Sequence, residues 1–170
     1  GKILFNSQQE NQIWAEVENL PTSGCLTSMK IFQHVGNFRD DFFIDYVDTD
    51  YCLRLRDKGY RVIISPQVGM KHPLGYYKPN KCYNFLFKKS MVTNYPPIRH
   101  YYWTRNGLTL VGERLSKNLK WSLREVYYLL IRRLVTGLLF EDKKILKIKY
   151  IIIAIFDASL SRRNKKRGLI

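Results

Sequence analysis

The sequence predicts an α/β fold in which short helices and strands are followed by a region made of helices. The β-branched run YRVIIS (60–65), bounded by Pro66, is typical of a strand. It directly follows a segment, 47–59, in which apolar residues recur at helical spacing. From Tyr83 onward the apolar residues recur at helical spacing without the alternation that marks strands, so helices alone are predicted there.

The remaining elements follow from capping residues and chain breakers. Residues 1–22 are predicted to form a loop or an incomplete element, and 28–38 a short helix with Ser28 as N-cap and Gly36 just past its end. The helix over 47–59 ends at Gly59, and Asp50 and Arg54 form an i,i+4 pair on it. A second short strand is expected over 67–72 and a loop over 73–81. The helical region is divided, with YPP (95–97) as a breaker, into 83–92, 98–116, 122–140 and 142–160.

Charge divides the chain in two. Residues 1–75 hold 8 Lys/Arg and 9 Asp/Glu, net −1, whereas residues 76–170 hold 21 and 5, net +16. A basic half of this size implies an anionic partner: nucleic acid, a phospholipid surface or a phosphate-bearing substrate. We expect an acceptor-side part over 1–82, a helical basic region over 83–160 and a disordered basic tail over 161–170.

Cysteine usage and hydropathy exclude several classes of protein. Cys25, Cys52 and Cys82 are odd in number and lack CxxC spacing, which argues against a disulfide framework or zinc site and for a reducing compartment. The longest apolar run, YIIIAIF (150–156), is far shorter than the roughly 20 residues of a membrane span. The chain begins with Gly1 and no signal-peptide pattern follows, so we expect a fragment or a processed product.

The acidic stretch FFIDYVDTDYCLRLRDKGY (42–60) admits three interpretations. A DxD pair in a loop can bind a divalent ion, but within one helix Asp48 and Asp50 lie about 200° apart and cannot share an ion. Asp48 is also a suitable N-cap, with Asp50 a first-turn acid favoured by the helix dipole. Alternatively, Asp48 is a general base, kept ionised by that dipole, that accepts a proton from a hydroxyl. From these residues alone the plain cap is the favoured interpretation.

The order of segments resembles the C-terminal half of the catalytic domain of inverting, family-2-type glycosyltransferases with a GT-A fold, and most closely bacterial rhamnosyltransferases. Six pieces in order carry the resemblance, over about residues 23–162: SGCLTS (23–28), VGNF (35–38), the acidic stretch (42–60), Pro66 and His72 followed by PLG, RHYYWTRNGLTL (99–110), and IKYIIIAIFDASLSR (148–162). The common family pattern has Glu-Asp at the base, whereas Val47 precedes Asp48 here, as is usual in the rhamnosyltransferase-like group.

The resemblance assigns roles to individual residues. Asp48 matches the acid that deprotonates the acceptor hydroxyl, and Asp50 and Arg54 match the helix that follows it. Ser23 and Gly24 match a loop on the acceptor side of the donor sugar. His72 matches a histidine that helps to hold the metal ion on the diphosphate. Trp103, in YYWTRN (101–106), is a candidate for stacking on a sugar or isoprenoid, although such a residue is more often core.

The implied reaction is a single in-line displacement with inversion at the anomeric carbon. The donor would be a nucleoside-diphosphate sugar, with rhamnose a candidate, and the acceptor a hydroxyl of a cell-surface polysaccharide or a lipid-linked saccharide. A divalent cation, Mg²⁺ or Mn²⁺, would neutralise the leaving diphosphate. In such enzymes the nucleotide and metal depend on an N-terminal half that these residues do not show, so we expect the isolated chain to be inactive. The implied location is the cytoplasm, on the inner face of the membrane.

The basic half leaves further alternatives open. Helix 122–140 carries Leu123, Val126, Tyr127, Leu130 and Leu134 on one side, and helix 142–160 mixes Lys143, Lys144, Lys147 and Lys149 with the apolar run. The apolar stripes either pack on each other beneath a solvated cationic face, or form a surface that docks on anionic lipid. A nucleic-acid-binding module is the rival function. Its charge fits, but zinc-finger spacing and RNA-recognition aromatic motifs are lacking, and the acidic first part would repel phosphates.

Overall fold

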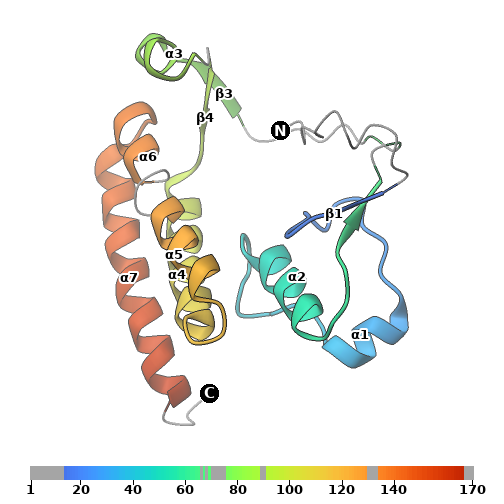
Figure 1. The fold of residues 1–170 in the computed structure, drawn as a ribbon. Coiled ribbons are helices and arrows are strands. Elements are labelled where there is room, and N and C mark those ends of the chain that lie inside the picture. Colours follow the sequence, from blue (N-terminus) through green and yellow to red (C-terminus); the bar gives the residue numbers. More distant parts are fainter. Residues whose placement is uncertain are drawn as a thin grey trace. The chain divides into compact units, whose positions relative to one another are not determined.

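The computed structural model describes residues 14–65, 67, 69, 76–88, 91–129 and 134–166. The chain divides into two compact units, unit 1 (Gly1–Leu74) and unit 2 (Gly75–Ile170), and each is described by itself (Figure 1). The described residues form an α/β structure in which helices predominate and two small sheets contribute two strands each. The α/β class predicted from the sequence is therefore confirmed at this coarse level.

The described residues of unit 1 form two strands and two helices: β1 (Ala15–Glu16), α1 (Met29–Val35), α2 (Val47–Asp57) and β2 (Ile63–Ile64). The strands pair antiparallel, with Ala15 opposite Ile64, and the Arg61 guanidinium lies 5.0 Å from the centre of the Trp14 ring. The strand expected over 60–65 is thus present as β2. Within 1–22, where a loop or an incomplete element was expected, the described residues include β1, a strand too short to show a local pattern.

Helix α1 ends as its glycine predicts. Gly36 has φ of +88°, which suits a residue without Cβ, and its backbone N–H donates to the Phe32 carbonyl at 2.8 Å. Ser28 occupies the N-cap position, but its side chain makes no capping hydrogen bond. The predicted helix is confirmed over a shorter span than 28–38.

Unit 2 begins with a β-hairpin-like pair that encloses a helix. It contains β3 (Tyr76–Pro79), α3 (Lys81–Phe87) and β4 (Met91–Asn94), with Tyr76 opposite Asn94 and Pro79 opposite Met91 in an antiparallel ladder. The loop expected over 73–81 and the helix expected over 83–92 were both wrong in part. Asn80 caps α3 by accepting from the Tyr83 N–H at 3.0 Å, and the helix ends at Phe87, where Lys88 turns left-handed.

The remaining described part of unit 2 contains four α-helices: α4 (Pro97–Arg114), α5 (Leu119–Tyr127), α6 (Leu134–Phe140) and α7 (Lys144–Lys166). Pro97 stands at the first position of α4, where its missing N–H costs nothing, so the breaker YPP marks a helix start. The single helix expected over 122–140 is described as two, and α5 starts earlier, at a cap in which Asn118 accepts from the Trp121 N–H at 3.0 Å. α7 runs to Lys166, so the expectation of disorder from residue 161 was wrong for its first residues.

The core of unit 2 lies where α4 packs against α7 on one side and against α5 (Figure 1). Leu110 and Ala154 are fully buried and Trp103 and Trp121 nearly so. The stripe predicted on helix 122–140 does not pack inward where α5 carries it, because Leu123 and Tyr127 are 58% and 61% exposed while Trp121 and Ser122 are buried. Within the described residues, no helix is long and apolar enough to cross a membrane.

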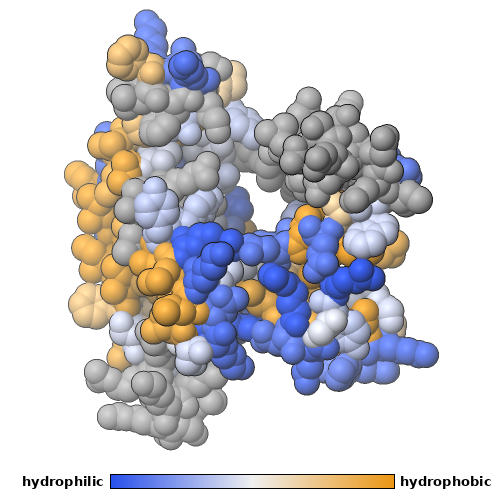
Figure 2. All heavy atoms as spheres, in the orientation of Figure 1, coloured by the Kyte–Doolittle hydropathy of each residue, from blue (hydrophilic) through white to orange (hydrophobic). Residues whose placement is uncertain are grey.

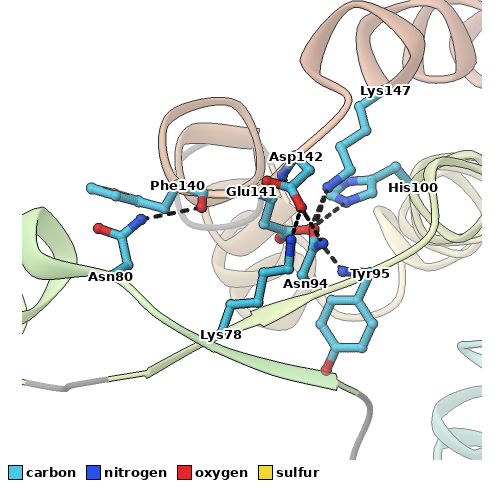
Figure 3. A network of polar contacts seen from close by, with 9 residues as sticks. All are labelled: Lys78, Asn80, Asn94, Tyr95, His100, Phe140, Glu141, Asp142 and Lys147. Atoms are coloured by element: carbon cyan, nitrogen blue, oxygen red, sulfur yellow. Dashed lines mark hydrogen bonds and ion pairs between the residues drawn. The ribbon is translucent and has the colours of Figure 1, made fainter.

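A buried polar network joins β4, α4 and the start of α7 (Figure 3). The Glu141 carboxylate accepts from Lys147 Nζ at 2.6 Å and from the Tyr95 N–H at 3.0 Å, and lies 3.3 Å from His100 Nε2. Burial alone would raise the pKa of Glu141, but the hydrogen bonds from His100, Lys147 and Tyr95 outweigh it and lower that pKa. The expectation that Lys147 belongs to a solvated cationic face was wrong, since its side chain is 1% exposed.

A second, exposed carboxylate extends this network to the sheet. Asp142 pairs with Lys78 of β3 and accepts from Asn94 Nδ2 at 2.9 Å, and Asn94 Oδ1 in turn accepts from Lys147 at 3.3 Å. The ammonium of Lys78 lowers the pKa of Asp142. The α6–α7 connection is therefore fixed to both strands of the small sheet.

Candidate functional site

The start of α2 carries a partly exposed carboxylate, that of Asp48. The helix begins at Val47, and the two residues before it, Asp45 and Tyr46, have φ of 63° and 65°. A left-handed conformation costs a residue such as tyrosine about 1–2 kcal/mol, so this approach to the helix is held by its surroundings. Asp48 is the second helical residue rather than the N-cap, which is Tyr46. The interpretation of Asp48 as a plain N-cap is therefore wrong.

Asp50, two residues further along α2, is buried and forms an ion pair with arginine. Its side chain is 4% exposed, and Arg54 Nε donates to it at 2.8 Å. Arg39 lies 3.9 Å from its other oxygen. The i,i+4 pair of Asp50 and Arg54 predicted from the sequence is confirmed.

Arg54 also fixes α2 to the end of α1. Its guanidinium donates to the carbonyls of Val35 at 2.9 Å and Asn37 at 2.8 Å while holding Asp50. This use of three acceptors is what the planar, five-donor guanidinium allows. Substrate binding by Asp50 and Arg54 stays a prediction, and the contacts found here are structural.

The two acids of DTD do not form a metal site. Both lie within α2, so their side chains project about 200° apart, and Asp50 is already engaged by arginines. The described part of the chain contains no group of three or more His, Cys, Asp or Glu residues that could hold a metal ion. His72, the predicted metal ligand, lies outside the described residues.

The turn that carries Ser23 and Gly24 lies close to the start of α2. Gly24 has φ of +78°, and the turn closes with the Cys25 N–H donating to the Thr22 carbonyl at 3.0 Å. Asn19 Nδ2 donates to Thr49 Oγ1 at 2.9 Å, which ties the segment before this turn to α2.

A second contact joins the segment before this turn to α2, because Cys52 Sγ donates to the Leu20 carbonyl at 3.8 Å. Burial and then the negative charge of Asp48 raise the pKa of Cys25, which is an exposed free thiol on the turn. Burial also raises the pKa of Cys52, with a smaller contribution from Asp48. The structure thus places the segment that leads into the Ser23–Gly24 turn against α2. The roles of Ser23, Gly24 and Asp48 toward a substrate stay predictions.

Aromatic packing also joins α2 to α1 and to the segment that follows α1. The Tyr51 ring stacks on Phe32 at 5.4 Å and contacts Phe38 at 4.5 Å, while Arg39 lies 3.9 Å from the centre of the Phe42 ring. Arg39, which bridges this cluster and Asp50, was missed from the sequence. Its position in FRDD gave only a weak signal, because two adjacent acids offered it nearer partners.

Trp103, the predicted stacking residue, lies in unit 2 and is buried. It is 5% exposed and meets Tyr95 and His100 edge to face at 4.6 and 5.4 Å, with the Arg99 guanidinium 5.1 Å from its ring centre. These contacts make it part of the core, and stacking on a ligand stays a prediction.

Comparison with known proteins gives a match over most of the sequence. The chain is 35% identical over 142 residues to the dTDP-rhamnosyl transferase RfbF of Shigella flexneri, and the aligned region is 80% of this chain. The resemblance to bacterial rhamnosyltransferases is confirmed. The aligned region is 43% of the relative, so the chain spans less than half the length of that rhamnosyltransferase. No protein-family model matches the chain, and no solved structure does.

Proposed function

We propose that this chain carries the acceptor side of an inverting glycosyltransferase that transfers rhamnose from dTDP-rhamnose to a saccharide hydroxyl. The observation that carries the proposal is the 35% identity to a dTDP-rhamnosyl transferase over a region that includes most of the chain. The local geometry agrees with it. Of the two acids in DTD, Asp48 is partly exposed and could meet a substrate, whereas Asp50 is buried in an ion pair.

In this proposal Asp48 is the general base. Its carboxylate takes the proton of the acceptor hydroxyl, whose oxygen attacks the anomeric carbon from the face opposite the nucleotide. The bond from that carbon to the diphosphate oxygen breaks, the nucleoside diphosphate leaves, and the configuration inverts. A GT-A fold for the complete catalytic domain belongs to the same proposal.

The remaining residues position the base. Arg54 and Asp50 hold α2 against the end of α1, and the left-handed backbone at Asp45 and Tyr46 sets the direction in which the helix begins. We assign the implied Mg²⁺ or Mn²⁺ no ligand among the described residues, because none of them forms a suitable cluster. His72 remains a candidate ligand.

The test is Asp48→Asn in the complete natural protein, assayed for transfer from dTDP-rhamnose to an acceptor saccharide. Loss of a general base should lower kcat by about 10²–10⁴-fold and leave the KM for the donor unchanged. Asp57→Asn, at the other end of α2 and exposed, removes the same charge and should keep full activity. Retention of most activity by Asp48→Asn would refute the base, and failure of the parent protein to use dTDP-rhamnose would refute the donor.

A further inference from the structure

The outward side of α7 is covered by large apolar side chains. Figure 2 shows hydrophobic atoms along the length of this helix. The most outward stripe follows helical spacing and includes Ile145, Ile148, Ile152, Ile155, Phe156 and Leu160, each between 42% and 86% exposed. The side that packs inward carries Lys147, Ile151, Ala154 and Ala158, each 7% exposed or less. Most of the large apolar side chains of the helix therefore face away from the core of unit 2.

Cations flank this apolar stripe at both ends of the helix. Lys143, Lys144 and Lys149 are exposed near its start, and the helix finishes with the sequence RRNKK (162–166). The single acid of α7, Asp157, accepts from the Tyr101 hydroxyl at 2.7 Å and so serves an internal contact. The outward side is thus apolar along its middle, with exposed cations at its start.

The lysines at the start of α7 line a shallow groove with an aliphatic floor. Its lining consists of Lys143, Lys144, Ile145, Leu146 and Lys149. Lys149 lies one turn beyond Ile145, on the same side of the helix. A groove of this composition suits an amphiphile that has an anionic head and an apolar chain.

The nearby carboxylates do not neutralise these lysines. Glu141 is held by Lys147, and Asp142 by Lys78. In the described part of the chain no carboxylate forms an ion pair with the three lysines of the groove. Lys143 and Lys144 also stand at the positive end of the helix dipole, which disfavours cations there and favours an anion. Both facts indicate that the anion comes from outside the chain.

We propose that the outward side of α7 lies on an anionic lipid bilayer surface. Its apolar stripe would enter the boundary between headgroups and acyl chains, while Lys143, Lys144 and Lys149 contact lipid phosphates. A second copy of this chain fits less well, because both ends of α7 are cationic and either relative orientation brings like charges together. Nucleic acid fits less well too, because a phosphate backbone offers nothing to cover the apolar stripe. The inference does not depend on the rhamnosyl transfer proposed above.

The test measures partition of the 170-residue chain onto vesicles. Vesicles of phosphatidylglycerol and phosphatidylcholine in equal parts should bind it far more tightly than vesicles of phosphatidylcholine alone. Replacing Lys143, Lys144 and Lys149 with Gln should weaken binding on the order of 100-fold, from the usual contribution of a cation near an anionic surface. The control replaces Lys81, Lys117 and Lys120, which are exposed lysines of unit 2 outside the groove, and should retain most of the binding.

A second variant separates lipid docking from simple charge attraction. Ile152→Ser with Phe156→Ser removes exposed apolar groups, so it should weaken binding by at least tenfold while leaving the thermal unfolding temperature unchanged. Unweakened binding by this variant, equal binding to neutral vesicles, or equal loss in the lysine control would overturn the proposal. So would a dimer in sedimentation that the apolar variant dissociates, or duplex DNA binding that displaces the vesicles.

Discussion

Lys147→Met offers a sharp test of how unit 2 is held together. The change keeps the length of the apolar part of the side chain but removes an ammonium that is 1% exposed and lies 2.6 Å from Glu141. Breaking a buried ion pair by removing one partner typically costs 3–5 kcal/mol, because the other charge stays buried. Here the N–H of Tyr95 at 3.0 Å and the His100 ring at 3.3 Å still stabilise the carboxylate. We therefore expect a loss of about 3 kcal/mol, at the lower end of that range.

The measurement is urea unfolding followed by far-UV circular dichroism, with Lys149→Met as the matched control. Lys149 lies on the same helix and its removal changes the net charge equally, but it is exposed, so the expected effect is within about 0.5 kcal/mol. Combining Lys147→Met with Glu141→Gln should recover part of the loss, because no charge is then left unpaired in the core. Equal stability of the two single variants would show that the pair contributes nothing and would refute the reasoning.

Three further predictions concern stability. Gly137→Ala should lower the unfolding temperature, because a Cβ there would lie 2.6 Å from His100 Cε1. The overpacking cost of about 1–3 kcal/mol is expected to exceed the helix-propensity gain of about 1 kcal/mol. A raised unfolding temperature would contradict this. Arg54→Lys should cost about 1–2 kcal/mol in urea unfolding, because one ammonium cannot serve a carboxylate and two carbonyls together, whereas Arg56→Lys, on the exposed side of α2, should be neutral. Because the folded state lowers the pKa of Glu141, its contribution is full above the ordinary carboxyl range and is lost as pH falls below about 4. In thermal melts, a Glu141→Gln variant should therefore lose less stability than the parent chain between pH 6 and pH 3. Equal losses in both proteins would show that Glu141 is not the source of the pH dependence.

The sequence predicted helix ends correctly where a glycine or proline at the end itself determines where the helix stops or starts. Gly36 ends α1 through its positive φ, and the prolines at residues 96–97 start α4, as the sequence indicated. The strands β1, β3 and β4 were missed because each is two to four residues long and is stabilised by a partner distant in sequence. A pattern of period two cannot be recognised over so short a run.

The orientation of α7 could not be predicted from hydropathy alone. Its sequence contains isoleucines on nearly every side, so the pattern did not identify which face would be buried. The structure buries Ala154 and Ala158, where small side chains let α4 approach, and it buries Lys147, where Glu141 supplies a counter-charge. The burial of these residues depends on contacts with α4 and with the segment before α7. The hydropathy pattern of α7 alone contains no information about those contacts.

The candidate site divides in the same way. The separation of Asp48 from Asp50 around α2 followed from helical geometry, and so did the pairing of Asp50 with Arg54. The contact of Asn19 with Thr49 of α2, and the bridge from Arg39 to Asp50, depend on loops that return to the helix from other parts of unit 1. Ser23 and Gly24 were predicted as site residues only because the sequence resembles glycosyltransferases.

The distribution of tryptophans gives each unit its own optical signature. Trp103 and Trp121 are buried in unit 2, whereas Trp14 in unit 1 is 45% exposed. Blue-shifted fluorescence should therefore come from unit 2 and respond to its unfolding. Selective quenching by iodide should report on Trp14 and the strand pair beside it. Comparison of the two signals during denaturation would show directly whether the two units unfold together or in separate steps.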